Sequence, residues 1–318
     1  MKIHHFFMLF CFMMVGNCFA NEKTTIRIGE QAGGTLEWEL TALLADSADF
    51  QLEIHSVANS EAGKAALQSG EVDMIVSDWI WVSNQRGQGE DFTFYPYSDT
   101  SGALVVPENS PIRTIKDLNG KRLGIAGNEQ DKNWLLLQAL AQKEGVDLNK
   151  SVEKTFGAPP LINEQIRENH VDAALTYWHF AARLEASGYR QIIDDKGILK
   201  ALGIEETVPN LGYVFKQSWG AAHQATLNNF FKAAQQARKQ LCTDDNAWQK
   251  VIPLTKTNDP ATQKLLRQRF CEGNIDTQWG DKEQQAAARI YTLLNTIQPQ
   301  QNTGNTLQTG TFWSGYLK

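Results

Sequence analysis

The sequence contains little cysteine and no excess of positive charge. Its 318 residues include four cysteines, and 36 acidic residues outnumber 30 lysines and arginines, which gives a net charge of −6. This balance gives no sign of a basic surface for nucleic acid or for an anionic membrane. Hydrophobic residues make up 42% of the chain, which excludes disorder and predicts a folded core, in two units by length.

The motifs of several enzyme and nucleotide-binding classes are also absent. The chain has no GxGxxG or GxxxxGK[ST] sequence for a dinucleotide or P-loop site, and no GxSxG or HExxH sequence for a hydrolase. No CxxC motif or cysteine–histidine spacing predicts a zinc site, and the four histidines that follow residue 20 are scattered. We therefore expect neither a metal site nor catalytic residues.

A short apolar run lies at the N-terminus behind a basic residue. Lys2 precedes the run Phe6–Val15, and the segment ends at Ala20. This order predicts a secretory signal peptide over residues 1–20, with cleavage after Ala20. The run is too short to span a bilayer, which takes about 20 residues. A lipid anchor on Cys18 is the alternative, but Asn17 is a poor residue to precede one.

Export determines how the remaining cysteines are interpreted. Removing residues 1–20 leaves Cys242 and Cys271. Two cysteines in an exported chain are typical of one disulfide, which for a loop of about 30 residues contributes about 3–4 kcal/mol. Two unpaired buried thiols are the alternative.

Two stretches of the chain alternate β-branched, apolar segments with helical patterns. The first begins at Thr24 and the second at Lys121, and a break with two prolines separates them. Alternating strands and helices predict parallel α/β layers. A return strand over residues 211–215 and a mostly helical region follow. We therefore expect lobe 1 over residues 21–106, lobe 2 over residues 107–211, and a return to lobe 1 with C-terminal helices and a tail over residues 212–318.

A short pattern occurs once in each stretch. Val72–Trp79 reads VDMIVSDW and Val171–Trp178 reads VDAALTYW, at an offset of 99 residues. Each copy predicts a buried strand that ends in a hydroxyl residue, with a tryptophan at the start of the following helix. Valine and aspartate at a strand start also recur by chance, but the shared position favours two lobes of like topology.

The repeated tryptophans predict a ligand cleft, because ligands of open parallel sheets bind beyond the carboxyl ends of the strands. If the lobes face each other, Trp79 and Trp178 supply two opposed indoles for a flat ligand; burial in the core is the alternative for both. Helix N-termini at the same edges favour an anion, which Lys132 and Arg183 would pair with. Asp78 is either a helix N-cap or a partner of the ligand. The candidate ligand-binding residues are Gly33, Gly34, Thr35, Asp78, Trp79, Trp81, Lys132, Asn133, Trp134, Tyr177, Trp178, His179 and Arg183.

Two segments resemble periplasmic substrate-binding proteins of ABC importers, in the group that binds nitrate, sulfonates, taurine or thiamine precursors. They are residues 110–126, SPIRTIKDLNGKRLGIA, and Val171–Trp178. The resemblance implies a bilobal α/β fold of the periplasmic-binding-protein type II class, with a helical C-terminal region and a two-strand hinge near residues 103–107 and 210–215. It also implies a periplasmic location, an ABC permease and its ATPase as partners, and closure of the lobes on the ligand.

Three further segments are similar to a narrower subfamily, whose members accompany quinoprotein alcohol dehydrogenases and bind pyrroloquinoline quinone (PQQ). They are Ser77–Ser83, Phe156–Ile162 and Tyr177–Phe180. The similarity implies that this flat tricarboxylate is the transported ligand rather than a catalytic cofactor, with quinoprotein dehydrogenases as further partners. Sulfonates, taurine, nitrate and a thiamine-precursor pyrimidine are the alternative ligands. An enzyme on the same fold and the sensing domain of a regulator are competing classes, for which the sequence offers no reactive or DNA-binding motif.

Overall fold

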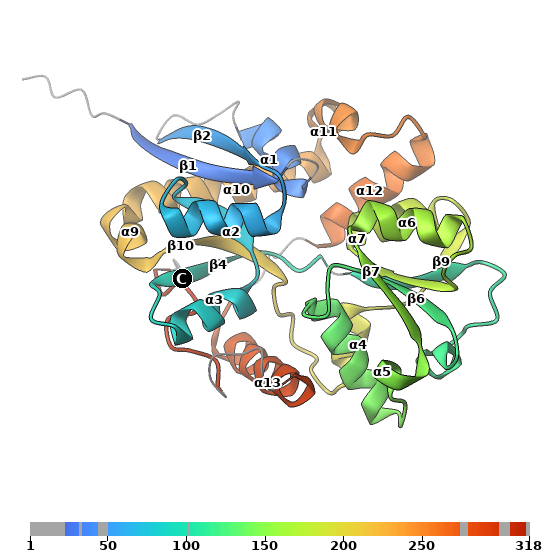
Figure 1. Ribbon diagram of the computed structural model, residues 1–318. Coiled ribbons are helices and arrows are strands. Elements are labelled where there is room, and N and C mark those ends of the chain that lie inside the picture. Colours follow the sequence, from blue (N-terminus) through green and yellow to red (C-terminus); the bar gives the residue numbers. More distant parts are fainter. Residues whose placement is uncertain are drawn as a thin grey trace, which may run out of the picture.

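The computed structural model describes residues 23–31, 34–43, 50–100, 102–273, 279–298 and 306–315. The predicted signal peptide at residues 1–20 and the candidate ligand residue Gly33 lie outside these ranges. Within them, no helix is both long and apolar enough to cross a membrane. Figure 1 shows two groups of strands and helices beside each other, with helices from the C-terminal part of the chain packed around them.

The first group, lobe 1, is built on a five-stranded sheet in the order β2-β1-β3-β10-β4. β1 pairs in parallel with β2 and β3, whereas β10 runs antiparallel between β3 and β4. Short crossovers through helices connect the parallel strands, as the alternating pattern predicts. The bounds are β1 Thr24–Gln31, α1 Thr35–Leu43, β2 Phe50–Val57, α2 Ser60–Ser69, β3 Met74–Ser77, α3 Trp79–Gly87, β4 Phe92–Ser98 and β10 Leu211–Lys216.

The second group, lobe 2, repeats this arrangement with the strand order β7-β6-β8-β5-β9. β6 pairs in parallel with β7 and β8, and β5 runs antiparallel between β8 and β9. The bounds are β5 Ala103–Pro107, the 3-10 helix η1 Ile115–Leu118, β6 Arg122–Ala126, α4 Lys132–Lys143, α5 Leu148–Ser151, β7 Glu153–Gly157, α6 Pro159–Arg167, β8 Ala173–Thr176, α7 Trp178–Glu185, β9 Tyr189–Asp194 and α8 Asp195–Ala201.

The chain crosses between the two sheets twice. It leaves lobe 1 after β4 and returns to it at β10. The bilobal α/β fold predicted from the sequence is therefore confirmed. The predicted boundaries differ at both crossings, because residues 103–106 pair within lobe 2 and residue 211 pairs within lobe 1. A strand buried on both faces is apolar in either sheet, so the sequence pattern does not assign it to one of them.

The C-terminal third is helical and contacts both lobes. α10 packs on α1 of lobe 1, α12 packs on α7 of lobe 2, and α13 packs on α4 of lobe 2. Near the C-terminus, Phe312 forms a bridge with Phe94 at the edge of the first sheet. The bounds are α9 Gln217–Ala222, α10 Gln224–Thr243, α11 Asp245–Val251, the 3-10 helix η2 Ile252–Thr255, α12 Pro260–Glu272 and α13 Asp281–Ile297.

The apolar core forms two large clusters, and each includes residues of both lobes. One contains Trp79 and Phe94 of lobe 1 together with Trp134 and Leu175 of lobe 2. The other is built mainly on α1, α10 and the first sheet, and Trp178 of lobe 2 joins it. The lobes are thus packed on each other at two places, which buries apolar surface between them.

The repeated sequence pattern corresponds to β3–α3 in lobe 1 and β8–α7 in lobe 2. In each lobe, the aspartate of the pattern pairs with an arginine of the neighbouring strand. Arg27 Nη2 lies 2.5 Å from Asp73 Oδ1, and Arg122 Nη2 lies 2.7 Å from Asp172 Oδ1. Each aspartate also accepts the backbone N–H of its arginine. These matching contacts confirm that the two lobes have like topology.

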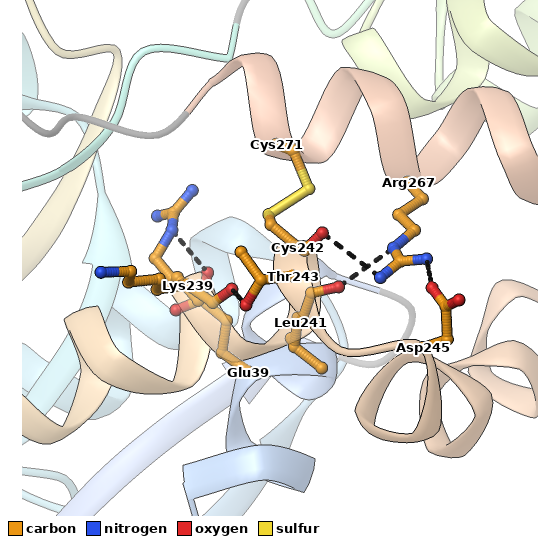
Figure 2. Close-up of a disulfide and its surroundings, with 9 residues drawn as sticks. Glu39, Lys239, Leu241, Cys242, Thr243, Asp245, Arg267 and Cys271 are labelled. Carbon is orange, nitrogen blue, oxygen red and sulfur yellow. Dashed lines mark hydrogen bonds and ion pairs between the residues drawn. A yellow bond between two sulfur atoms is a disulfide. The ribbon is translucent and has the colours of Figure 1, made fainter.

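Cys242 and Cys271 form a disulfide, as predicted from the sequence. The bond joins the end of α10 to the last turn of α12 (Figure 2). Arg267, one turn earlier in α12, donates hydrogen bonds to the carbonyl oxygens of Leu241 and Cys242. The two helices are therefore held together both covalently and by hydrogen bonds.

Candidate functional site

The carboxyl ends of the parallel strands of the two lobes face each other across the lobe boundary. Tyr177, which follows β8, shows this most directly. Burial raises the pKa of its phenol, and so do the negative charges of Asp131 in its own lobe and of Asp78 and Glu61 in lobe 1. The Tyr177 hydroxyl donates to Asp131 Oδ2 over 3.1 Å. This edge, where strand ends of both lobes meet, is the candidate ligand site.

Trp79 lies in the core rather than on an open cleft surface. Its side chain is 1% exposed and its ring packs 6.0 Å from that of Phe312. The indole Nε1–H donates to the carbonyl oxygen of Pro209, over 3.0 Å, in the second crossing segment. Buried indoles take such a partner because an unpaired N–H is costly. The alternative of core packing therefore describes Trp79.

Trp178 is also buried, but its partner belongs to the other lobe. It is 8% exposed, and its ring meets that of Trp38 in α1 edge-on at 5.9 Å. Trp79 and Trp178 belong to different core clusters, so the structure does not bring the two indoles together as opposed walls of one slot. Trp178 instead joins lobe 2 to lobe 1.

Two of the helix N-termini at this edge are already occupied by aspartates. Asp78 accepts the N–H of Trp81 and caps α3, and Asp131 accepts the N–H of Asn133 and caps α4. These carboxylates satisfy the amides that an anionic ligand would need. At α7, by contrast, Tyr177 stands at the cap position and makes no side-chain cap bond in the part of the chain that the structure describes.

Lys132 is engaged in the hinge instead of being available to a ligand. Its ammonium group donates to Asn210 Oδ1 and lies 3.8 Å from Asp195 Oδ2. The Asn210 amide in turn donates to the carbonyl oxygens of Asp99 and Thr100, over 3.2 and 3.1 Å. Lys132 and Asn210 thus tie the start of α4 to both crossing segments.

Three other candidate residues are buried or pack on neighbouring rings. Trp81 stacks on Phe92 at 5.3 Å, and Trp134 packs edge-on against Phe156 at 6.3 Å. Asn133 is buried at the start of α4, where a Cβ atom on Gly102 of the first crossing segment would lie 2.9 Å from its side chain. Their assignment to a ligand stays a prediction.

The turn before α1 has the expected geometry for close approach. The N–H of Gly34 donates to the carbonyl oxygen of Gln31 over 2.8 Å, and Thr35 opens the helix. A Cβ atom at position 34 would lie 2.9 Å from that oxygen, so the turn requires glycine. Gly34 and Thr35 therefore lie at the carboxyl end of β1, as predicted.

His179 and Arg183 of α7 each have a polar atom without a partner in the described part of the chain. Burial, followed by the positive charge of Arg183, lowers the pKa of His179 to about 3, so its imidazole is neutral. Arg183 donates from Nη2 to the carbonyl oxygen of Thr255 over 2.7 Å. His179 Nδ1 and Arg183 Nη1 are buried and have no hydrogen-bond partner among the described residues.

A hollow of about 250 Å³ lies between α6 and α7, and Arg183 is part of its lining. Its surface is mostly apolar, and Leu161 at the start of α6 is 49% exposed there. An exposed apolar side chain beside a guanidinium suits a ligand with a flat or apolar body and an acidic group. The hollow is lined by Pro160, Leu161, Asn163, Glu164, Arg167, Phe180 and Arg183.

Sequence reasoning missed three residues of lobe 1 at the same edge. Glu30 is the residue before the last of β1 and Ser77 is the last of β3, and both are buried, with Glu30 Oε1 and Ser77 Oγ unpaired among the residues that can be described. Burial, and then the negative charge of Glu37, raise the pKa of Glu30. The third is Trp38, whose indole Nε1 is also without a partner in the described ranges. A polar residue that ends an apolar strand was the available signal for the first two.

Over the described ranges, no group of three or more histidine, cysteine, aspartate or glutamate residues is placed to hold a metal ion.

A family model described as "NMT1/THI5 like" matches residues 46–246, which is more than half of the chain. The chain belongs to the NMT1/THI5-like family. This confirms the broad group predicted from the sequence, and the PQQ-binding subfamily stays a prediction. Among curated proteins, a probable histidine-binding protein of Campylobacter jejuni is 32% identical over 88 residues, 27% of this chain and 34% of that protein. The chain thus spans about a third of the length of this relative.

Solved structures of binding proteins share the fold of this NMT1/THI5-like chain. The periplasmic aliphatic sulphonate binding protein of Escherichia coli is 18% identical, with a TM-score of 0.61 over 78% of this chain and 83% of that one. The alkanesulfonate-binding protein of Xanthomonas axonopodis pv. citri, bound to MOPS, is 17% identical, with a TM-score of 0.68 over 92% and 99%. All three relatives are named as binding proteins, in keeping with the expectation of a binding protein and not an enzyme.

Proposed function

We propose that this protein is the periplasmic solute-binding component of an ABC importer, and that it captures a small ligand between the facing strand ends of its two lobes. The family and the shared fold support this class of function. An ABC permease with its ATPase would be the partner that receives the ligand. The quinoprotein dehydrogenases predicted as further partners stay a prediction.

One observation carries the proposal. Elements that meet the facing edge contain buried polar atoms without a hydrogen-bond partner in the described part of the chain, in α1, β1 and β3 of lobe 1 and in α7 of lobe 2. An unpaired buried polar atom costs about 1–3 kcal/mol, so native proteins keep few of them. Ligand groups bound at this edge would supply the missing partners. The atoms are Glu30 Oε1, Trp38 Nε1, Ser77 Oγ, His179 Nδ1 and Arg183 Nη1.

The chemistry of these groups favours a ligand with an acidic group on a flat or apolar body. Arg183 has one guanidinium nitrogen engaged with Thr255 and another free to bind a carboxylate or sulfonate. The apolar hollow with Leu161 and Phe180 lies directly beside it. PQQ is the ligand that the sequence resemblance favours, and its planar carboxylated rings match this combination.

The carboxylates of the same edge favour a second candidate, a zwitterion such as taurine. Asp78 and Glu61 lie near enough to Tyr177 to raise the pKa of its phenol, and Asp131 accepts its hydroxyl. A ligand with three carboxylates would meet these negative charges, whereas an ammonium group would pair with them. An amino sulfonate would supply an acidic group and an amine in one small molecule.

Thermal unfolding of the protein, purified after export, tests the proposal with PQQ, taurine, MOPS and histidine as separate probes. A ligand at 100 times its Kd stabilises the folded state by about 2.7 kcal/mol, which is a rise in Tm of about 5–10 °C for a chain of this size. We expect such a rise with PQQ. A rise with taurine or MOPS alone would assign the site to sulfonates, and no rise with any probe would count against ligand capture of these classes.

A matched pair of arginine variants tests whether the acidic group of the ligand binds at Arg183. Arg183→Gln is expected to weaken binding of the active probe at least about tenfold, because a charged hydrogen bond is lost. Arg167→Gln is the control, since Arg167 lines the same hollow but pairs with Glu164 at 3.0 Å. Equal affinities for the two variants in isothermal titration would contradict the placement of the ligand at Arg183.

A further inference from the structure

The end of α12 that carries the disulfide lies against the first crossing segment between the lobes. The carbonyl oxygen of Gly273 accepts hydrogen bonds from Ser98 Oγ over 3.1 Å and from the backbone N–H of Asp99 over 3.2 Å. The approach is so close that a Cβ atom at position 273 would lie 2.0 Å from Cγ2 of Thr100. No side chain larger than that of glycine fits while α12 keeps this position.

α12 is attached to lobe 1 only two residues before this contact. The disulfide at Cys271 fixes it to Cys242 at the end of α10, which packs on α1 (Figure 2). Arg267 adds hydrogen bonds to the carbonyl oxygens of Leu241 and Cys242 and an ion pair with Asp245. The covalent link therefore couples the tip of α12 to α10 and, through the packing of α10 on α1, to lobe 1.

The opposite face of α12 contacts lobe 2. Arg269 Nη2 lies 2.7 Å from Glu185 Oε2 in α7, and the segment before α12 accepts Arg183 through the carbonyl oxygen of Thr255. A cavity at this junction is lined by Trp178 and Glu185 of lobe 2 together with residues of α12. The same helix therefore touches lobe 1, the crossing segment and lobe 2.

We propose that the Cys242–Cys271 disulfide makes α12 a strut that holds the lobe 1 end of the first crossing segment and limits how far the lobes open. With the bond intact, Gly273 keeps Ser98 and Asp99 in line with β4, so movement is confined to the part of the segment beyond them. Without the bond, the tip of α12 can leave the hinge while the core of lobe 1 stays folded. The disulfide then acts on the open–closed balance as well as on global stability.

Hydrogen exchange of the unliganded protein tests the strut directly. Cys242→Ser combined with Cys271→Ser is expected to raise the exchange rate of the amides in residues 92–100 at least about tenfold, measured by mass spectrometry below the onset of unfolding. Leu148→Ala is the control, because it removes a buried side chain of α5 in the far part of lobe 2. A similar increase in the control, or none in the serine variant, would overturn the proposal.

A second variant leaves the disulfide in place, and so tests the contact even if the serine variant does not fold. Gly273→Ala is expected to drive the tip of α12 from the hinge and to reproduce the exchange increase at residues 92–100. Adding Thr100→Ser removes the Cγ2 atom that clashes, and is expected to restore most of the protection. Unchanged exchange in Gly273→Ala would show that the contact does not restrain the segment.

The consequence for ligand capture rests on the proposed function. If the strut favours the closed form, the double serine variant and Gly273→Ala both weaken binding of the active ligand probe by about threefold or more. Small-angle X-ray scattering should also show that the lobes of these variants open further than those of the unmodified protein. Altered exchange and scattering without any ligand response would leave the strut intact and count against the proposed ligand site. A ligand response with unaltered exchange would count against the strut.

Discussion

The strand–helix unit β3–α3 in lobe 1 and its counterpart β8–α7 in lobe 2 begin alike and end differently. Both start with an aspartate that pairs with an arginine of the neighbouring strand, and both end in a buried hydroxyl residue, Ser77 or Thr176. The next residue is an aspartate that caps α3 in lobe 1, but a tyrosine without a cap bond in lobe 2, among the residues described. The tryptophan that follows, Trp79 or Trp178, is buried in both copies.

The partners of these tryptophans separate the roles of the two copies. Trp79 binds Pro209 of the crossing segment and packs on Phe312. Trp178 packs on Trp38 of the other lobe, and the helix that it opens carries His179, whose Nδ1 has no partner among the described residues. One copy thus secures the hinge, while the other forms the lobe contact beside the candidate ligand site. A shared sequence pattern preserves the local geometry and leaves the function of each copy to its surroundings.

Removing each indole is expected to have the largest effects on stability and to distinguish the two copies most clearly. Trp79→Ala should lower the free energy of unfolding by about 3–5 kcal/mol, because it leaves a large cavity and an unpaired carbonyl oxygen. Trp178→Ala should also destabilise the protein. In addition, it should weaken binding of the active ligand probe by about tenfold, since it loosens the contact with Trp38. Urea unfolding and isothermal titration measure the two effects. A larger loss of affinity in Trp79→Ala than in Trp178→Ala would reverse the roles of the copies.

The two aspartate–arginine pairs provide the next comparison. Asp73→Asn should cost about 2 kcal/mol in urea unfolding, because it removes charged hydrogen bonds from a side chain only 10% exposed. Asp172→Asn should cost less, since that side chain is 33% exposed and solvent screens its pair more strongly. Equal losses in both variants would show that exposure does not distinguish the pairs.

Acid titration tests the contribution of the Asp172–Arg122 pair separately. The hydrogen bond from Arg122 holds the pKa of this carboxyl below its usual value of about 3.9. The pair therefore contributes its full stability above about pH 4, and this contribution is lost as the pH falls through the lower folded pKa. The difference in stability between the unmodified protein and Asp172→Asn should shrink below about pH 4. A difference that stays constant down to pH 2 would contradict this account.

Asp131 should produce the opposite dependence on pH. Burial raises its pKa to about 6 in the folded protein, so the folded state holds the proton more tightly than the unfolded state does. Stability should consequently fall as the pH rises from about 4 to about 6. Asp131→Asn keeps an oxygen to cap α4 but does not titrate, so its Tm should lack this fall. If the Tm of both proteins changes with pH in the same way, burial does not raise the pKa of Asp131 as described.

The helix caps are expected to give the smallest effects. Asp78→Ala should destabilise the protein by about 1 kcal/mol, the usual loss for an N-cap. Tyr177→Phe should change stability by about 0.5–1.5 kcal/mol at most, because it removes only the hydroxyl bond to Asp131. Urea unfolding with intact near-ultraviolet circular dichroism checks both. A loss of several kcal/mol in Tyr177→Phe would show that folding of the lobe 2 copy, β8–α7, depends on the Tyr177 hydroxyl.

Much of the fold was predictable because it depends on local periodicity. Alternating strands and helices and the repeated pattern were sufficient to predict the lobes, and Cys242 and Cys271, which follow the predicted signal peptide, were sufficient to predict the disulfide. Asp78 was recognised as a potential cap from its position alone. The crossing strands were less well placed, because β5 and β10 are apolar segments that would be buried in either sheet.

The ligand-binding residues named from the sequence stay a prediction, although the structure shows where those in the described ranges lie. Tyr177 stands at the N-cap of α7, at a strand end, whereas Arg183 lies in the last turn of that helix. Lys132 was assigned to the ligand, yet its partner Asn210 lies 78 residues further along the chain and draws it into the hinge. Glu30 was missed because an acidic residue that ends a strand usually faces solvent. Side-chain partners that are distant in sequence leave no local pattern to detect.

The order of strands and helices and the repeated strand–helix unit could be predicted from the sequence, because each depends on neighbouring residues, and the disulfide could be predicted once residues 1–20 were set aside as a signal peptide. Long-range packing determined that Trp79 bonds to the second crossing segment, that Trp178 packs on the other lobe and that Gly273 touches the first crossing segment. Those roles depend on which surfaces meet once both sheets have formed. Packing between distant segments is set by the shape and charge of whole lobes, which no short stretch of sequence contains.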